Sequence, residues 1–179
     1  LLAFALIVVI GIGTSALNYK NLSFIQFSNG WTEHSYKVIT SVSSSMVSML
    51  DRVTLFRGYL LTANRDFLDL YRKKTDDYYK QIELARHLTA DNPDQQARLA
   101  DLVKVSDQWR DAVAEPAIAL MARPETQTEA RALEISGQGK SAVDAVRALV
   151  AAIDRVERDL LSSRSADQNE AFTDGFTTA

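Results

Sequence analysis

Cysteine is absent from the 179 residues, and glycine and proline are scarce, with seven and three copies. The lack of cysteine excludes disulfides, thiolate zinc sites and covalently attached haem. Few glycines and prolines, among recurrent Ala, Leu and Arg, favour helices over strands. A net charge of −3 with no basic stripe argues against a general nucleic-acid binder.

Charge is also absent from the first residues, LLAFALIVVIGIGTSAL, and the first charged side chain is Lys20. About twenty apolar residues cross a bilayer, so we expect residues 1–19 to be the end of a transmembrane helix. The alternative is a signal-peptide core that ends near Gly13, Ser15 and Ala16. Because the chain starts without Met, we expect a fragment. Its domain is residues 20–170, and residues 171–179 would lead to a second span that follows.

Apolar residues recur at helical spacing in four segments, and none shows sustained two-residue alternation. The predicted helices are about 29–62, 65–90, 93–121 and 126–168. Asn64 and Asn92 can cap the second and third helices. Pro116 should bend the third, and Gly137 and Gly139 should interrupt the fourth. Short connections make neighbouring helices antiparallel. The sequence therefore predicts an all-α, antiparallel up-down four-helix bundle with long first and last helices.

Small polar residues in the middle of the predicted bundle are candidates for a ligand site. Ser43 and Ser106 fall at nearly the same height, and Thr75 lies somewhat above them. Such residues can line a cavity for a small ligand or ordered water. Close packing of the helices explains them equally well.

Enzymatic chemistry has little support in the sequence. There is no phosphate-binding glycine loop, no Ser/His/Asp set at recognisable spacing and no metal-ligand cluster. The histidines, His34 and His87, flank polar faces, and a metal site would need a third ligand beside both. We therefore expect surface histidines, no catalytic residue and no cofactor.

Five segments occur in an order that resembles the CHASE3 family of extracytoplasmic sensor domains: RGYLLT, YRKKTDDYY, TADNPDQQARLADL, SGQGKSAVDAVRALV and ERDLLSSR. The resemblance covers about residues 35–168. The residues that carry it most specifically are Arg57, Gly58, Tyr59, Leu60, Glu157 and Arg164. It implies a sensor domain outside the bacterial inner membrane, in a parallel homodimer, that passes a stimulus inward to a histidine kinase by helix displacement. A methyl-accepting chemoreceptor and a membrane-tethered scaffold without ligand are the alternatives.

Arg57 poses a question, because an apolar helix seam has no evident need for a charge. The family often has a Glu four residues earlier, where this chain has Val53, and that removes one partner. A count of residues along the helices places Arg57 at the level of Glu129 or Glu134. We therefore favour a structural ion pair over a ligand-anion contact or a dimer contact, and we expect Gly58 to leave room for a neighbouring helix or for the guanidinium. Glu157 and Arg164 are predicted at the edge of the seam in the last helix.

Overall fold

The computed structural model describes the course of residues 2–177, and it describes side chains throughout residues 32–163 and at scattered positions outside that range. The chain divides into two compact units. One is Lys37–Arg158, and the other combines the residues up to Tyr36 with those from Asp159 onward. The candidate site lies within the unit Lys37–Arg158.

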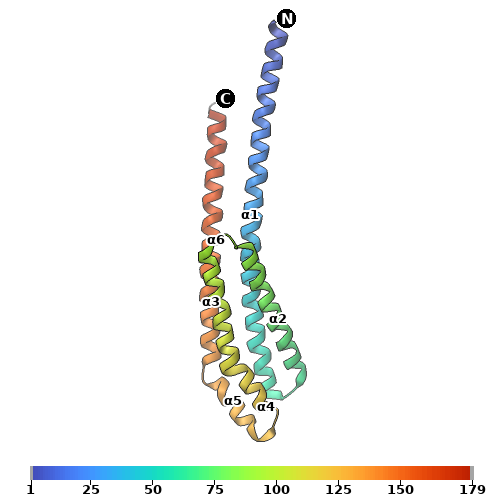
Figure 1. The fold of residues 1–179 in the computed structure, drawn as a ribbon, viewed down its shortest axis with the longest axis vertical. Coiled ribbons are helices and arrows are strands. Elements are labelled where there is room, and N and C mark those ends of the chain that lie inside the picture. Colours follow the sequence, from blue (N-terminus) through green and yellow to red (C-terminus); the bar gives the residue numbers. More distant parts are fainter. Residues whose placement is uncertain (1, 178–179) are drawn as a thin grey trace. The chain divides into compact units, whose positions relative to one another are not determined.

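Helices and short connections make up the described part of the chain, and no strand occurs there. The elements in chain order are α1 (Leu2–Thr62), α2 (Arg65–Leu88), α3 (Pro93–Trp109), the π-helix η1 (Arg110–Ala114), α4 (Glu115–Met121), the 3-10 helix η2 (Pro124–Thr126), α5 (Gln127–Ile135) and α6 (Gln138–Thr177). Within the unit Lys37–Arg158 successive helices turn back on one another at short connections (Figure 1). The unit is an all-α helical bundle.

Local chemistry explains where several helices begin and end. The side chain of Asn64 accepts a hydrogen bond from the Asp66 amide at 2.9 Å, and that of Asn92 accepts one from the Gln95 amide at 3.1 Å. Both caps satisfy amides that the first helical turn leaves unpaired. Between α5 and α6, Gly137 has a φ of +82°, a backbone conformation that glycine adopts without steric cost. The predicted interruption is confirmed at this glycine.

Pro116 changes the helix differently from the predicted bend. The chain forms the π-helix η1 just before it, and the Glu115 amide donates to the carbonyl of Arg110, five residues back. Proline lacks an amide donor, and its ring crowds the carbonyl four residues before it. The wider π turn accommodates both defects, so the helix continues into α4.

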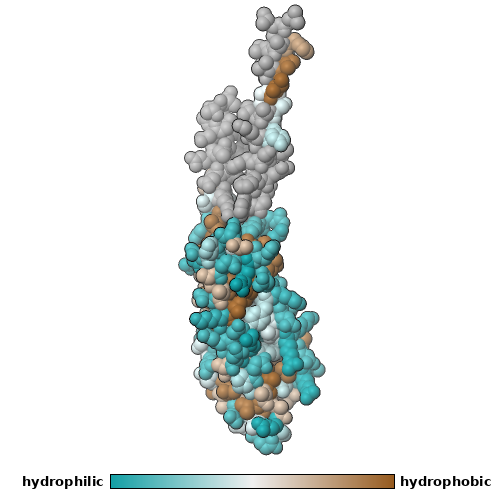
Figure 2. Space-filling view, in the orientation of Figure 1, coloured by the Kyte–Doolittle hydropathy of each residue, from teal (hydrophilic) through white to brown (hydrophobic). Residues whose placement is uncertain are grey.

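The core of the unit follows the predicted apolar stripes. On α1 the buried side chains include Val42, Met49, Val53, Phe56 and Leu60. They pack against buried residues of the other helices, among them Tyr71, Tyr78, Ile82, Leu99, Leu102, Trp109, Val146 and Ile153. Full burial of one large apolar side chain contributes about 1.5–3 kcal/mol. The face visible in Figure 2 is mainly hydrophilic, with scattered hydrophobic residues.

The predicted membrane span at residues 1–19 is not found. Residues 2–19 belong to α1. Within the described part of the chain, no helix is both long enough and apolar enough to cross a bilayer. Residue 1 of the predicted span, and residues 178–179 of the predicted tail, lie outside the described residues.

Candidate functional site

The most unusual residue of the bundle is Arg52, which is fully buried on α1 between Met49 and Phe56. Arginine is almost never fully buried without a charged partner, because removing its charge from water costs several kcal/mol. Four aromatic rings surround its guanidinium, with ring centroids 5.0–6.0 Å from the central carbon. They belong to Tyr71, Tyr78, Tyr79 and Trp109. We call Arg52 and these four rings the aromatic box.

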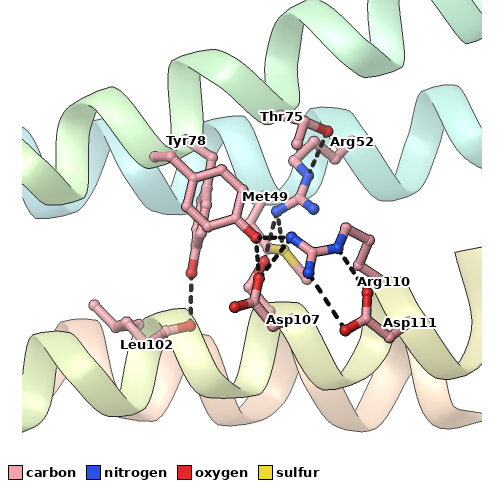
Figure 3. Close-up of polar contacts among 10 residues, drawn as sticks. Met49, Arg52, Thr75, Tyr78, Leu102, Asp107, Arg110 and Asp111 are labelled. Atoms are coloured by element: carbon pink, nitrogen blue, oxygen red, sulfur yellow. Dashed lines mark hydrogen bonds and ion pairs between the residues drawn. The ribbon is translucent and has the colours of Figure 1, made fainter. Parts of the chain in front are cut away.

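Hydroxyl groups rather than carboxylates bind the guanidinium (Figure 3). Its Nε donates to Thr75 Oγ1 at 3.0 Å, and its Nη1 donates to Ser106 Oγ at 2.7 Å and lies 3.7 Å from Met49 Sδ. Its Nη2 is buried and has no hydrogen-bond partner among the described residues. Hydroxyls and ring faces therefore stabilise this charge, and each cation–π contact contributes about 0.5–2 kcal/mol.

The three tyrosines of the aromatic box keep neutral hydroxyls at pH 7. Burial raises the pKa of Tyr71 and Tyr78, and the nearby Arg52 charge offsets only part of that rise. Burial, followed by the hydrogen bond to Asp107, raises the pKa of Tyr79. Tyr78 donates to the Leu102 carbonyl at 3.0 Å, whereas the buried Tyr71 hydroxyl has no partner among the described residues. The box therefore holds a second buried polar group without a hydrogen-bond partner among the described residues, although Arg52 and Thr75 lie close enough to lower its pKa.

Tyr79 connects the aromatic box to the surface. Its hydroxyl bonds the carboxylate of Asp107 and accepts from Arg110 Nη1 at 3.0 Å. Arg110 also pairs with Asp107 and with Asp111, each at 2.8 Å, and holds the pKa of Asp111 below its usual value. Tyr79 lines a surface groove of about 480 Å³ together with Val103, Ile82 and four charged residues. One tyrosine ring thus contacts both the buried guanidinium and the groove.

Two of the three predicted ligand-site residues meet in this box. Thr75 and Ser106 both bind Arg52, but Ser43 is exposed and lies about 13.5 Å of helix rise before Arg52. The height assigned to Ser43 was therefore wrong, and Arg52 is the α1 residue that reaches Ser106. The level of Arg52, though not its burial, was readable from the sequence, because Arg52 and Thr75 lie equally far along the chain from the α1–α2 turn.

Arg57, five residues after Arg52 and near the C-terminal end of α1, makes an ion pair at the level that the residue count predicted. Its Nε and Nη2 both donate to Oε1 of Glu134, at 2.7 Å and 2.6 Å. The Arg57 side chain is half exposed, whereas the Glu134 side chain is 14% exposed. Of the two acids predicted at the level of Arg57, Glu129 and Glu134, the ion-pair partner is Glu134 on α5.

Glycine at two positions allows close approach around this pair. A Cβ on Gly58 would lie 2.7 Å from Cδ1 of Phe67, so Gly58 makes room for an α2 ring rather than for the guanidinium. A Cβ on Gly139 would lie 2.9 Å from Glu134 Oε2 and 3.2 Å from Trp109 Nε1. Both of these atoms are buried without a hydrogen-bond partner in the described part of the chain. Gly139 therefore lets α6 approach Glu134 and Trp109.

The remaining residues that carry the family resemblance are Tyr59, Leu60, Glu157 and Arg164. Tyr59 and Leu60 are buried in the hydrophobic core. Glu157 is buried instead of lying at the predicted edge, because the Gln95 amide of α3 covers it and donates to its Oε1 at 2.9 Å. The Arg164 side chain lies outside those described. His34 is partly exposed and His87 is exposed.

Comparison with known proteins gives a consistent result. The CHASE3 domain profile matches residues 28–167. The sensor domain of the Rhodopseudomonas palustris histidine kinase HK9 superposes with a TM-score of 0.65 at 25% identity, covering 72% of this chain and 98% of that domain. None of the curated protein sequences matches the chain. The chain belongs to the CHASE3 family.

Proposed function

We propose that the chain is the extracytoplasmic sensor domain of a membrane-bound bacterial receptor whose output is a histidine kinase. One observation carries this proposal: the bundle superposes on nearly the whole sensor domain of the kinase HK9. The match to the CHASE3 profile supports the sensor role independently of the superposition.

The signal would pass inward as a displacement of α6 relative to α1. Packed helices shift between discrete arrangements by about 1–2 Å, and a stimulus selects one arrangement by binding it more tightly than the other. The break at Gly137, just before α6, supports this mechanism because it separates α6 from the α5 segment that the Arg57–Glu134 pair ties to α1.

A parallel homodimer through the outer face of α1 fits this role. Exposed residues on that face recur at alternating steps of three and four: Thr40, Ser43, Val47, Leu50 and Thr54. This is the spacing of a coiled-coil seam. It is distinct from the buried stripe of α1, and Val47 and Leu50 on it are 57% and 41% exposed. The polar members predict a weak dimer that tethering to a membrane would favour.

A topology reporter inserted after Thr89, in the α2–α3 connection of the full receptor, tests the location. We expect a reporter that matures only outside the cytoplasm to be active there, and one that works only in the cytoplasm to be silent. The same pair of reporters placed in the kinase module should give the reverse pattern. Activity of the cytoplasmic reporter after Thr89 would contradict the proposal.

A further inference from the structure

The aromatic box contains more hydrogen-bonding capacity than the protein uses. A guanidinium carries five N–H donors, and the described contacts of Arg52 engage its Nε and Nη1 but leave Nη2 without an acceptor. The Tyr71 hydroxyl, on a ring 6.0 Å from the guanidinium carbon, is likewise buried without a partner. Buried polar groups are nearly always hydrogen-bonded, and three in the box have no partner among the described residues: Arg52 Nη2, the Tyr71 hydroxyl and Trp109 Nε1. Trp109 Nε1 lies on the side of Gly139 and Glu134. The Tyr71 hydroxyl can accept from the neighbouring Arg52, but its own O–H and the remaining N–H of Nη2 still lack an acceptor.

We propose that the aromatic box is the binding site for a small organic carboxylate, held by Nη2 of Arg52 and the hydroxyl of Tyr71. Arginine binds carboxylates through directed, charge-assisted N–H bonds, and the anion would also supply the counter-charge that the box lacks. The aromatic rings would pack against the apolar part of the ligand. This inference rests on the proposed sensor function, because it names the chemical class of its stimulus.

The groove beside Tyr79 gives the carboxylate a route to Arg52. A swing of the Tyr79 ring, which lies 5.7 Å from the guanidinium carbon, would release its hydrogen bonds to Asp107 and Arg110 and open the box toward Val103 in the groove. The charged residues that line the groove are two acids and two bases, Asp76, Glu83, Lys80 and Arg86. Because these four charges balance, the attraction for an anion at this place comes from Arg52.

A purely structural arginine would behave differently when it is replaced. Exchanging a buried charge for an apolar residue of similar volume is often neutral or stabilising, provided that no partner charge is left behind. The hydrogen-bond partners of Arg52 in the described structure are hydroxyls and a thioether sulfur, and aromatic rings surround its guanidinium. Arg52→Met should therefore fold with an unchanged or higher melting temperature and should lose only the carboxylate response.

The test is a titration of the 179-residue chain with sodium propionate at constant ionic strength, with propionamide as the neutral probe of the same shape. The measurements are the melting temperature and the NMR signal of the Arg52 side-chain Nε–H. We expect propionate to raise the melting temperature saturably and to shift the Nε–H signal, and propionamide to do neither. Arg147→Met removes an exposed arginine of α6 and should keep the full response, whereas Arg52→Met should abolish it.

Three results would overturn the proposal. One is an equal propionate response in Arg52→Met, and another is an equal response of the wild-type chain to propionamide. The third is an Arg52 Nε–H signal that stays fixed over the whole propionate titration, and this result counts even if Arg52→Met fails to fold. Because the titration does not depend on the membrane, its failure leaves the topology reporters as a separate test of the sensor function.

Discussion

Replacing Arg57 with methionine tests whether the Arg57–Glu134 ion pair, near the C-terminal end of α1, stabilises the bundle. Methionine keeps most of the aliphatic stem and removes the charge. The change strands Glu134, whose carboxylate is largely buried and has an Oε2 without a hydrogen-bond partner among the described residues. The chain would then hold a largely buried carboxylate beside Trp109 and Gly139, and Arg57 is its ion-pair partner among the described residues.

The expected loss follows from the exposure of the two partners. An exposed ion pair contributes about 0–1 kcal/mol. A buried charge stranded by loss of its partner costs about 3–5 kcal/mol. Arg57 is 50% exposed and Glu134 is 14% exposed, so the pair falls between these limits. We expect the free energy of unfolding to fall by about 2 kcal/mol, which lowers the melting temperature by about 4–8 °C for a chain of this size.

Urea unfolding of Arg57→Met, Glu134→Gln and the double variant gives the coupling energy directly. We expect a coupling of about 1–2 kcal/mol, since the glutamine amide has no charge to strand. Arg147→Met is the matched control, because Arg147 pairs with Asp144 while both side chains are about half exposed, and it should cost less than about 0.5 kcal/mol. A coupling near zero, or equal losses in Arg57→Met and Arg147→Met, would refute the reasoning.

Three further predictions concern packing, ionisation and assembly. Gly58→Ala should destabilise the chain by about 1 kcal/mol, because overpacking against Phe67 outweighs the gain in helix propensity. In a Phe67→Ala background, the same change should stabilise the chain. The midpoints of urea unfolding measure both effects. The pKa values of Tyr71, Tyr78 and Tyr79 are higher in the folded chain than in the unfolded chain. The stability that these tyrosines contribute is therefore fully present below about pH 10 and is lost as pH rises through their folded pKa values. Tyrosinate absorbance should appear together with unfolding, and ionisation of these tyrosines in the folded chain would contradict their burial. Leu50→Lys should weaken cross-linking between receptor copies through α1 without lowering the melting temperature, whereas Lys80→Glu, on the groove, should leave cross-linking unchanged.

The helix ends were predictable because their causes are local. Asn64 and Asn92 satisfy amides two and three residues away, and Gly137 supplies a left-handed conformation at its own position. The apolar stripes gave the all-α bundle, because period alone shows which face of a helix is buried. The level of the Arg57 partner, at Glu129 or Glu134, followed from counting residues along the helices.

The burial of Arg52 was not predictable by the same means. Its position beside the α1 stripe allows either a surface residue or a core residue, and the choice depends on rings that α2 and α3 contribute. The Ser43 height was wrong for a related reason: Ser43 lies nine residues, or two and a half helical turns, before Arg52, and this error moves a residue both past its neighbours and to the opposite, exposed face of α1. The π-helix was likewise hidden, because Pro116 signals a defect without specifying how the backbone absorbs it.

Trp109 connects two charged sites of the bundle, the aromatic box around Arg52 and the surroundings of Glu134. Its ring lies 5.4 Å from the Arg52 guanidinium carbon and packs edge-on against Phe56, while its Nε1 lies beside Gly139 at the start of α6. It is also the last residue of α3, where the π-helix begins and where Arg110 holds the hydroxyl of Tyr79. A carboxylate bound at Arg52 would therefore change the surroundings of a ring that contacts α1 and lies against the first turn of α6. Those are the two helices whose relative displacement would carry the signal, so Trp109 is a direct physical connection between the proposed stimulus and the proposed output.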